Sequence, residues 1–176
     1  MMNSRPIRIL VAGFLTAASL AAAADVNDTS EVRRLSLPGS PVQVVLPRED
    51  WALNQEQRPA GEASIYYVLW SQARQAYLSV RIERTNACAS AESCLDAALA
   101  NPAYRDAQGL ERAEQGPFRL AKFHVDDPRG APLKQANVLA SAYAGGVRID
   151  LHLTKVGRER PELDPLVEFL REVSVR

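Results

Sequence analysis

The chain has 176 residues, of which 47% are hydrophobic and 24% charged, and its 21 basic side chains balance its 21 acidic ones. This balance provides no basic stripe to neutralise phosphates, so a nucleic-acid partner is not expected. The length suits one domain whose core is large enough to be stable without several disulfides.

The first 24 residues have the pattern of a secretory signal peptide. Arg5 and Arg8 form a positive start, residues 9–20 form an apolar core, and residues 21–24 are four alanines that a signal peptidase accepts. A core of about 12 residues is too short to span a bilayer, so we expect cleavage after Ala24 and no integral membrane segment. The sequence therefore predicts a periplasmic protein with three parts: a signal peptide (1–24), a flexible leader (25–31) and a single domain (32–176).

Strand patterns fill most of the chain before residue 85. Alternating apolar positions and bounding turn residues predict strands over 32–37, 42–46, 64–70 and 76–84. The segment 64–70 (SIYYVLW) is apolar on both alternating sets, so both of its faces should be covered. In the segment 76–84, we expect Leu78, Val80 and Ile82 to point inward. The segment 51–63 (WALNQEQRPAGEA) is interpreted as a loop.

The two cysteines, Cys88 and Cys94, lie at the start of a predicted helix. In an oxidising compartment a single pair is most simply a disulfide. Six residues of helix would separate the two Cα atoms by about 9 Å, beyond the reach of a disulfide, so the helix must begin between them. Ser90 is a suitable N-cap, and Glu92 then falls in the first turn. A redox site would favour a Cys-x-x-Cys spacing and a structural zinc site would need four ligands, so both alternatives fit the pattern less well.

Two further hairpins and a last helix follow. The segments 110–115 and 118–125 are predicted to pair across Gly116 and Pro117, and the segments 134–144 and 147–155 across Gly145 and Gly146, which tolerate positive φ. Apolar residues at helical spacing predict a C-terminal helix, and SVR at the end is a candidate short strand; the helical positions are Leu163, Leu166, Val167 and Leu170. The fold class is therefore α+β, an antiparallel sheet of hairpins with a mid-chain helix and a C-terminal helix packed on it.

This order of elements resembles the PsbP-like fold over residues 32–175. The segments that carry the resemblance are LPREDW at 46–51, GGVRIDLHLTK at 145–155 and LVEFLREVSV at 166–175. The fold is shared by the PsbP photosystem extrinsic proteins, a Ran-binding nuclear transport factor and small bacterial proteins. The resemblance implies a non-enzymatic module that binds another protein.

One strand carries the residues on which an enzyme could be built. In the segment 147–155, Asp150 and His152 point to the same side, and strand pairing could bring Ser79 or Ser141 near them. An acid beside a histidine can orient a general base, whereas the alternative is a solvated face of cross-strand polar pairs. The sequence favours the second interpretation because it has no motif for a catalytic serine, a zinc helix or a phosphate loop.

A metal site is also considered. It would combine His124, Asp126 and Asp127 with Asp150 and His152, and only the fold could assemble it. The alternative is a histidine near the end of a strand, followed by an ordinary DDPRG turn. We therefore predict neither a metal nor a cofactor.

The candidate binding residues are Trp51, Arg58 and Arg129, because exposed tryptophan and arginine often anchor protein partners. Trp51 has a second interpretation as a core-capping side chain. The sequence favours a periplasmic, non-enzymatic module that binds another protein, such as an envelope complex or a toxin. The alternatives are a small hydrolase or metal-dependent enzyme using Asp150 and His152, and a carrier of a small apolar ligand held between the sheet and the last helix.

Overall fold

The computed structural model describes residues 32–48, 51–59 and 63–176, and Arg129 only in its backbone. The predicted signal peptide and leader lie outside the described residues. Within them, the chain forms two antiparallel sheets and two α-helices, one in the middle of the chain and one near its end. The α+β class predicted from the sequence is confirmed.

The elements follow the chain as β1 (Val32–Ser36), β2 (Gln43–Pro47), β3 (Ala52–Gln57), β4 (Ser64–Ser71), β5 (Ala76–Arg84), α1 (Ala91–Leu99), η1 (Pro102–Tyr104), β6 (Gln108–Gln115) and β7 (Phe118–Asp126). They continue as η2 (Pro128–Gly130), β8 (Lys134–Ala144), β9 (Val147–Gly157), α2 (Asp164–Phe169), η3 (Leu170–Glu172) and β10 (Ser174–Val175). The three η elements are single turns of 3-10 helix.

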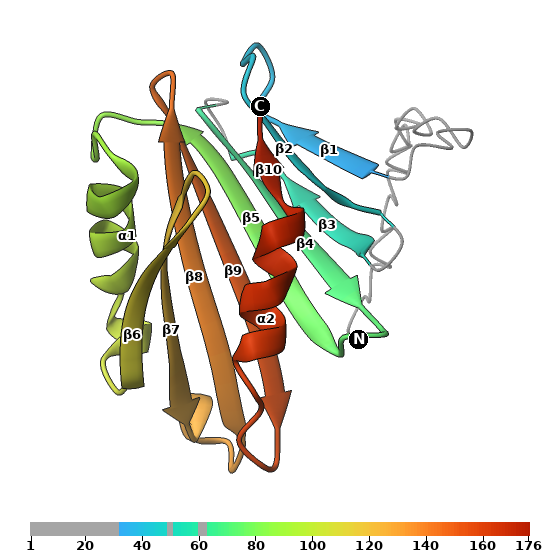
Figure 1. Cartoon of the computed structure of the whole chain (residues 1–176), viewed down its shortest axis with the longest axis vertical. Coiled ribbons are helices and arrows are strands. Elements are labelled where there is room, and N and C mark those ends of the chain that lie inside the picture. Colours follow the sequence, from blue (N-terminus) through green and yellow to red (C-terminus); the bar gives the residue numbers. More distant parts are fainter. Residues whose placement is uncertain (1–31, 49–50, 60–62) are drawn as a thin grey trace, which may run out of the picture.

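A seven-stranded sheet organises the molecule, with the strand order β3-β4-β5-β9-β8-β7-β6. Its inner face packs against α2 and against the small sheet β1-β2-β10, and α2 runs along this face in Figure 1. The main core lies between these layers. As predicted, Leu78, Val80 and Ile82 of β5 point into it and are fully buried.

The end of the chain pairs with an early strand of the described domain. Ser174 and Val175 form β10 and pair with Val45 and Val44 of β2, which confirms the predicted terminal strand. The main chain of Arg176 extends this contact with two hydrogen bonds to Gln43, of 2.8 and 2.9 Å. The small sheet therefore joins the two ends of the described domain.

The outer face of the large sheet carries a second and smaller core. Leu95 of α1 packs there with Phe123 and Leu139, and the other buried members of the cluster are Ala121 and Val125. The contacts of α1 fall on β7, β8 and β9, whereas no comparable contact joins α1 to β4 or β5. The outer face is therefore covered on one side only.

The predicted disulfide between Cys88 and Cys94 is present, with the two Cα atoms 5.1 Å apart. Ser90 is the N-cap of α1, and its hydroxyl accepts a hydrogen bond from the main-chain N–H of Ser93, at 3.1 Å. Glu92 lies in the first turn, as expected. The helix begins between the two cysteines, which brings them close enough to be joined.

The hairpin between β8 and β9 has the predicted turn. Gly145 and Gly146 have φ values of 56° and 78°, in the region where an L side chain is strained. Their turn sets the register of the two central strands, so that Ser141 lies opposite Asp150. This register also places His152 opposite Leu139.

Two details of the prediction are wrong. The segment interpreted as a loop at 51–63 contains β3, whose six residues are all exposed. An edge strand of this kind lacks an alternating apolar pattern, and its pairing with β4 forms it. In β4, Ile65, Tyr67 and Leu69 are buried, while the opposite set is only half-buried because α1 does not reach it.

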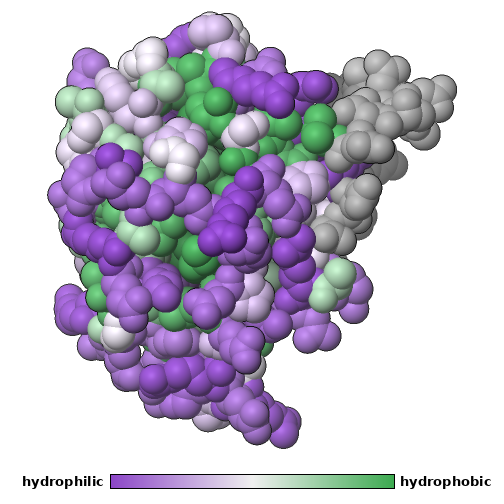
Figure 2. All heavy atoms as spheres, in the orientation of Figure 1, coloured by the Kyte–Doolittle hydropathy of each residue, from purple (hydrophilic) through white to green (hydrophobic). Residues whose placement is uncertain are grey.

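No helix in the described part of the chain is long and apolar enough to cross a membrane. Figure 2 shows the face of the molecule that carries α2. Hydrophilic residues cover most of its lower part, and hydrophobic residues reach the surface mainly in the upper and central parts. The two cavities described below lie on the opposite face of the large sheet.

Candidate functional site

His152 of β9 lies on the outer face of the sheet within a network of side-chain hydrogen bonds. Its Nε2 atom lies 2.9 Å from Oδ1 of Asn137 and 2.8 Å from Oγ1 of Thr154. Asn137 is fully buried, and its Oδ1 atom also accepts from the Thr154 hydroxyl at 3.2 Å. Because Oδ1 can only accept, the hydrogen of the ring is on Nε2, and Nδ1 is the acceptor of the neutral imidazole.

Burial lowers the pKa of His152 from its ordinary 6.5 to about 4. The ring is therefore neutral at neutral pH, and it is a weak general base there. Among the described residues, no side chain or main-chain group forms a hydrogen bond with Nδ1. His152 therefore presents an unprotonated nitrogen that can accept a hydrogen bond.

Asp150 lies one position along the same face, but its partners differ from those of His152. The Ser141 hydroxyl donates to Oδ1 of Asp150 at 2.7 Å. Nε of Arg148 lies 2.6 Å from Oδ2 of Asp150 and forms an ion pair with it, although its N–H is poorly aligned for a hydrogen bond. Arg148 is 8% exposed, and its Nη2 donates to the main-chain oxygen of Cys94 at 3.2 Å. Asp150 is thus held by a cation and a hydroxyl, and it does not orient His152.

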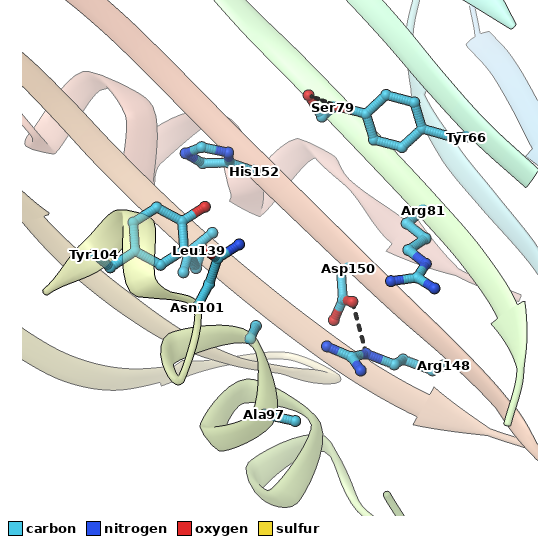
Figure 3. Close-up of a pocket in the computed structure, with 11 residues that line it drawn as sticks. Tyr66, Ser79, Arg81, Ala97, Asn101, Tyr104, Leu139, Arg148, Asp150 and His152 are labelled. Carbon is cyan, nitrogen blue, oxygen red and sulfur yellow. Dashed lines mark hydrogen bonds and ion pairs between the residues drawn. The ribbon is translucent and has the colours of Figure 1, made fainter. Parts of the chain in front are cut away.

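Arg148, Asp150 and His152 border a cavity of about 320 Å³ between the sheet and the α1–η1 segment. Figure 3 shows that its wall combines Tyr66, Ser79 and Arg81 from the sheet with Asn101 and Tyr104 from the segment after α1. The Tyr66 hydroxyl donates to Ser79 at 2.8 Å. The ring of Tyr104 meets His152 edge to face, with the centroids 5.8 Å apart. The pKa of Tyr104 is raised, mainly by burial and to a smaller extent by the nearby Tyr66 and Asp150. Its hydroxyl therefore stays protonated.

A second cavity of about 340 Å³ shares Asn101, Tyr104 and His152 with the first. It continues toward Pro128 and Gln135. Both cavities lie on the outer face. The space between the sheet and α2, where an apolar ligand was considered, is lined by fully buried core residues such as Leu151 and Phe169.

The structure brings together some of the residues proposed for catalysis. Strand pairing places Ser79 opposite His152 and Ser141 opposite Asp150, as the sequence suggested. The Ser141 hydroxyl, however, donates to Asp150, and the Ser79 hydroxyl accepts a hydrogen bond from Tyr66. Neither hydroxyl forms a hydrogen bond with His152 among the contacts of the described residues. The arrangement suits recognition of a polar group better than activation of a nucleophile.

The metal site that was considered is not assembled. His124 lies on the inner face of β7, where its Nε2 is 2.8 Å from the main-chain oxygen of Pro161, and Asp126 binds Arg160 at 2.9 Å near the same end. His152 lies on the outer face, so the sheet itself separates the two histidines. Within the described residues, no group of three or more His, Cys, Asp or Glu side chains is placed to hold a metal ion.

The three candidate binding residues do not form one surface. Trp51 is 1% exposed and packs against Phe169, with the ring centroids 4.9 Å apart. It is therefore a core side chain and does not anchor a partner at the surface. Arg58 is exposed beyond the edge strand β3 and pairs with Glu56 at 2.8 Å. Arg129 lies in η2, between β7 and β8, several strands away, and its side chain is outside the described part of the structure.

Sequence reasoning missed most of the cavity wall. Asn101 caps and Tyr104 ends a short 3-10 turn, a segment for which no element was predicted from the sequence. The one available signal was NP at 101–102, because asparagine before proline favours the start of a turn; the Asn101 side chain indeed accepts from Ala103 N at 3.0 Å. Alternation along 147–155 puts Arg148 on the same face as Asp150 and His152, and nothing in the sequence indicated that α1 would bury it.

No protein-family model matches the sequence, and no match is found among curated proteins. Fourteen chains of solved structures are similar to this one. Among them is the solution structure of cyanobacterial PsbP (CyanoP) from Synechocystis sp. PCC 6803, with 12% sequence identity, a TM-score of 0.45 and coverage of 89% of this chain and 99% of that one.

Proposed function

We propose that this protein is a non-enzymatic binding module that acts in the periplasm and that its partner is another protein. The disulfide between Cys88 and Cys94 supports an oxidising compartment. The histidine best placed for catalysis is neutral and is not oriented by the neighbouring carboxylate, which favours binding over catalysis.

The observation that carries the proposal is an aromatic pair, one member of which is exposed, on the uncovered part of the outer face. Trp70 of β4 and Tyr77 of β5 lie opposite each other with ring centroids 4.6 Å apart, and Tyr77 is 46% exposed. Arg81 lies on the same face of β5 and is also exposed. Aromatic residues and arginine are the types most enriched at the centres of protein interfaces.

The experiment is affinity capture from cross-linked envelope extract of the source cells. The bait is the tagged protein, compared with two variants. Y77E places a glutamate in the aromatic pair, and the control L110E places a glutamate at an exposed residue of the distant edge strand β6. We expect one protein in near-equal amount with the wild type and with L110E, and its loss with Y77E, because a charge in the centre of an apolar contact is costly. If Y77E still captured the partner, the interface would lie elsewhere on the protein. If the wild type enriched no protein at all, the proposal would be overturned.

A further inference from the structure

The cavity beside His152 has the composition of a small-ligand site, and of the proposed protein-binding surface only Arg81 borders it. Its volume of about 320 Å³ lies at the lower end of the usual range for ligand pockets. It is too small for a folded partner. Tyr77, the exposed member of the aromatic pair, is not among the residues that border it.

The charges around the cavity are balanced. Arg148 is paired with Asp150 at 2.6 Å, and Arg81 is paired with Glu83 at 2.9 Å. His152, with its pKa lowered by burial, adds no charge at neutral pH. A charged ligand would therefore have to break one of these pairs or enter without a counter-charge, so the cavity favours a neutral one.

The wall offers both donors and acceptors. Asn101 commits its Oδ1 to the main chain and leaves its NH₂ group as a donor, and the Tyr104 hydroxyl points into the cavity (Figure 3). Nδ1 of His152 is an acceptor without a partner among the described residues. A hydroxyl group both donates and accepts, so a ligand with several neighbouring hydroxyls can satisfy such a wall. The rings of Tyr66 and Tyr104 add apolar surface beside these polar groups.

We propose that this cavity binds a small uncharged saccharide. The second cavity, of about 340 Å³, shares Asn101, Tyr104 and His152 with the first. Two adjoining spaces of similar size on either side of shared polar and aromatic residues fit a ligand of two linked sugar units. The partner surface is centred on Trp70 and Tyr77, neither of which borders the cavity, so the two proposals can fail separately although Arg81 belongs to both.

The experiment is an NMR titration of the ¹⁵N-labelled protein. The probes are glucose, N-acetylglucosamine, cellobiose and chitobiose, with glucuronate and glucosamine as charged counterparts. We expect at least one neutral sugar to give saturable shifts at Asn101, Tyr104 and His152, with a Kd on the order of 1 mM or tighter. The disaccharide should bind more tightly than its single unit, and the charged counterparts at least fivefold more weakly.

Three variants locate the site. A97F should weaken binding at least tenfold, because Ala97 is an exposed residue of α1 that borders the cavity and a larger side chain there fills it without disturbing the core. Y104F removes only one hydroxyl and should weaken binding about threefold to tenfold, the loss of one hydrogen bond. Y77F, the matched control outside the cavity, should leave the affinity unchanged.

Three results would overturn the proposal. One is the absence of saturable shifts with every neutral sugar up to about 50 mM, since binding weaker than this has no specificity. Another is tighter binding of a charged counterpart, which would assign the cavity to another ligand class. Unchanged affinity in A97F with a folded spectrum would place the sugar elsewhere and would equally contradict the site.

Discussion

At the scale of the residue, His152 shows how burial changes a side chain that the sequence presents as a candidate base. Its alternation with Leu151 and Leu153 predicted that it would face away from the core, and it does. The same alternation could not predict that the α1–η1 segment would cover it. That cover, through desolvation, lowers the pKa of His152 to about 4.

This shift predicts how stability depends on pH. The unfolded chain takes up a proton at His152 near pH 6.5, whereas the folded protein does so only near pH 4. The free energy of unfolding should therefore fall as the pH drops from about 6.5 toward 4, by up to about 3 kcal/mol from this residue. Urea unfolding of the wild type and of H152Q at several pH values measures this, and the variant should lose less stability across the window.

The control is H124Q, the same replacement at the histidine on the inner face. It should retain the pH dependence of the wild type between pH 6.5 and 4. If H124Q lost that dependence and H152Q kept it, the assignment to His152 would be wrong.

At the scale of the element, α1 depends on a covalent bond and a cap at its first turn. The disulfide closes a short loop across the N-cap, from Cys88 outside the helix to Cys94 in its first turns. Cys94 also offers its main-chain oxygen to Arg148, which links the start of the helix to the ion pair with Asp150. The bond therefore supports one wall of the cavity as well as the helix.

Replacing both cysteines by alanine should lower the free energy of unfolding by about 2 kcal/mol, since a loop of this length restricts the unfolded chain only modestly. Urea unfolding measures the change. Reducing the wild type should have the same effect, and adding reductant to the double variant should have none. Equal stability of oxidised and reduced wild type would show that the bond does not stabilise the fold.

At the scale of the whole molecule, the large sheet separates two cores of unequal size. The inner core joins β4, β5, β7, β8 and β9 to α2 and the small sheet, whereas the outer one has five buried residues, Leu95 of α1 and four on the sheet beneath it. Stability in such a structure is not uniform, because segments with little buried apolar surface open without global unfolding. The cavity wall formed by α1 and η1 belongs to the weaker layer.

Hydrogen exchange of the native protein should reveal this difference. Amides of α1 should exchange through local opening, at a free energy at least about 2 kcal/mol below that of the central strands β8 and β9. The amides of Leu95 and Leu151 are suitable reporters, as each side chain is almost fully buried in its own core. Equal protection of the two layers would mean that the molecule unfolds as a single unit.

The sequence by itself determined the strands with clean alternation, the Gly145–Gly146 hairpin, the start of α1 and the disulfide. In each of these the deciding physics is local: side chains alternate along a strand, two glycines accept positive φ, and a serine caps the helix between two cysteines that must be close. Local patterns of this kind are present in any short window of the chain.

Only the tertiary structure decided which faces are covered and which polar residues meet. β3 exists because β4 offers it hydrogen bonds, and Trp51 is buried because Phe169 returns from the far end of the chain. His124 and His152 are separated because β7 and β9, on either side of β8, present them on opposite faces of the sheet. The cavity joins residues from β4, β5, β9 and the α1–η1 segment, far apart in sequence. Contacts over such separations depend on how the layers pack, and no periodicity within a single segment encodes them.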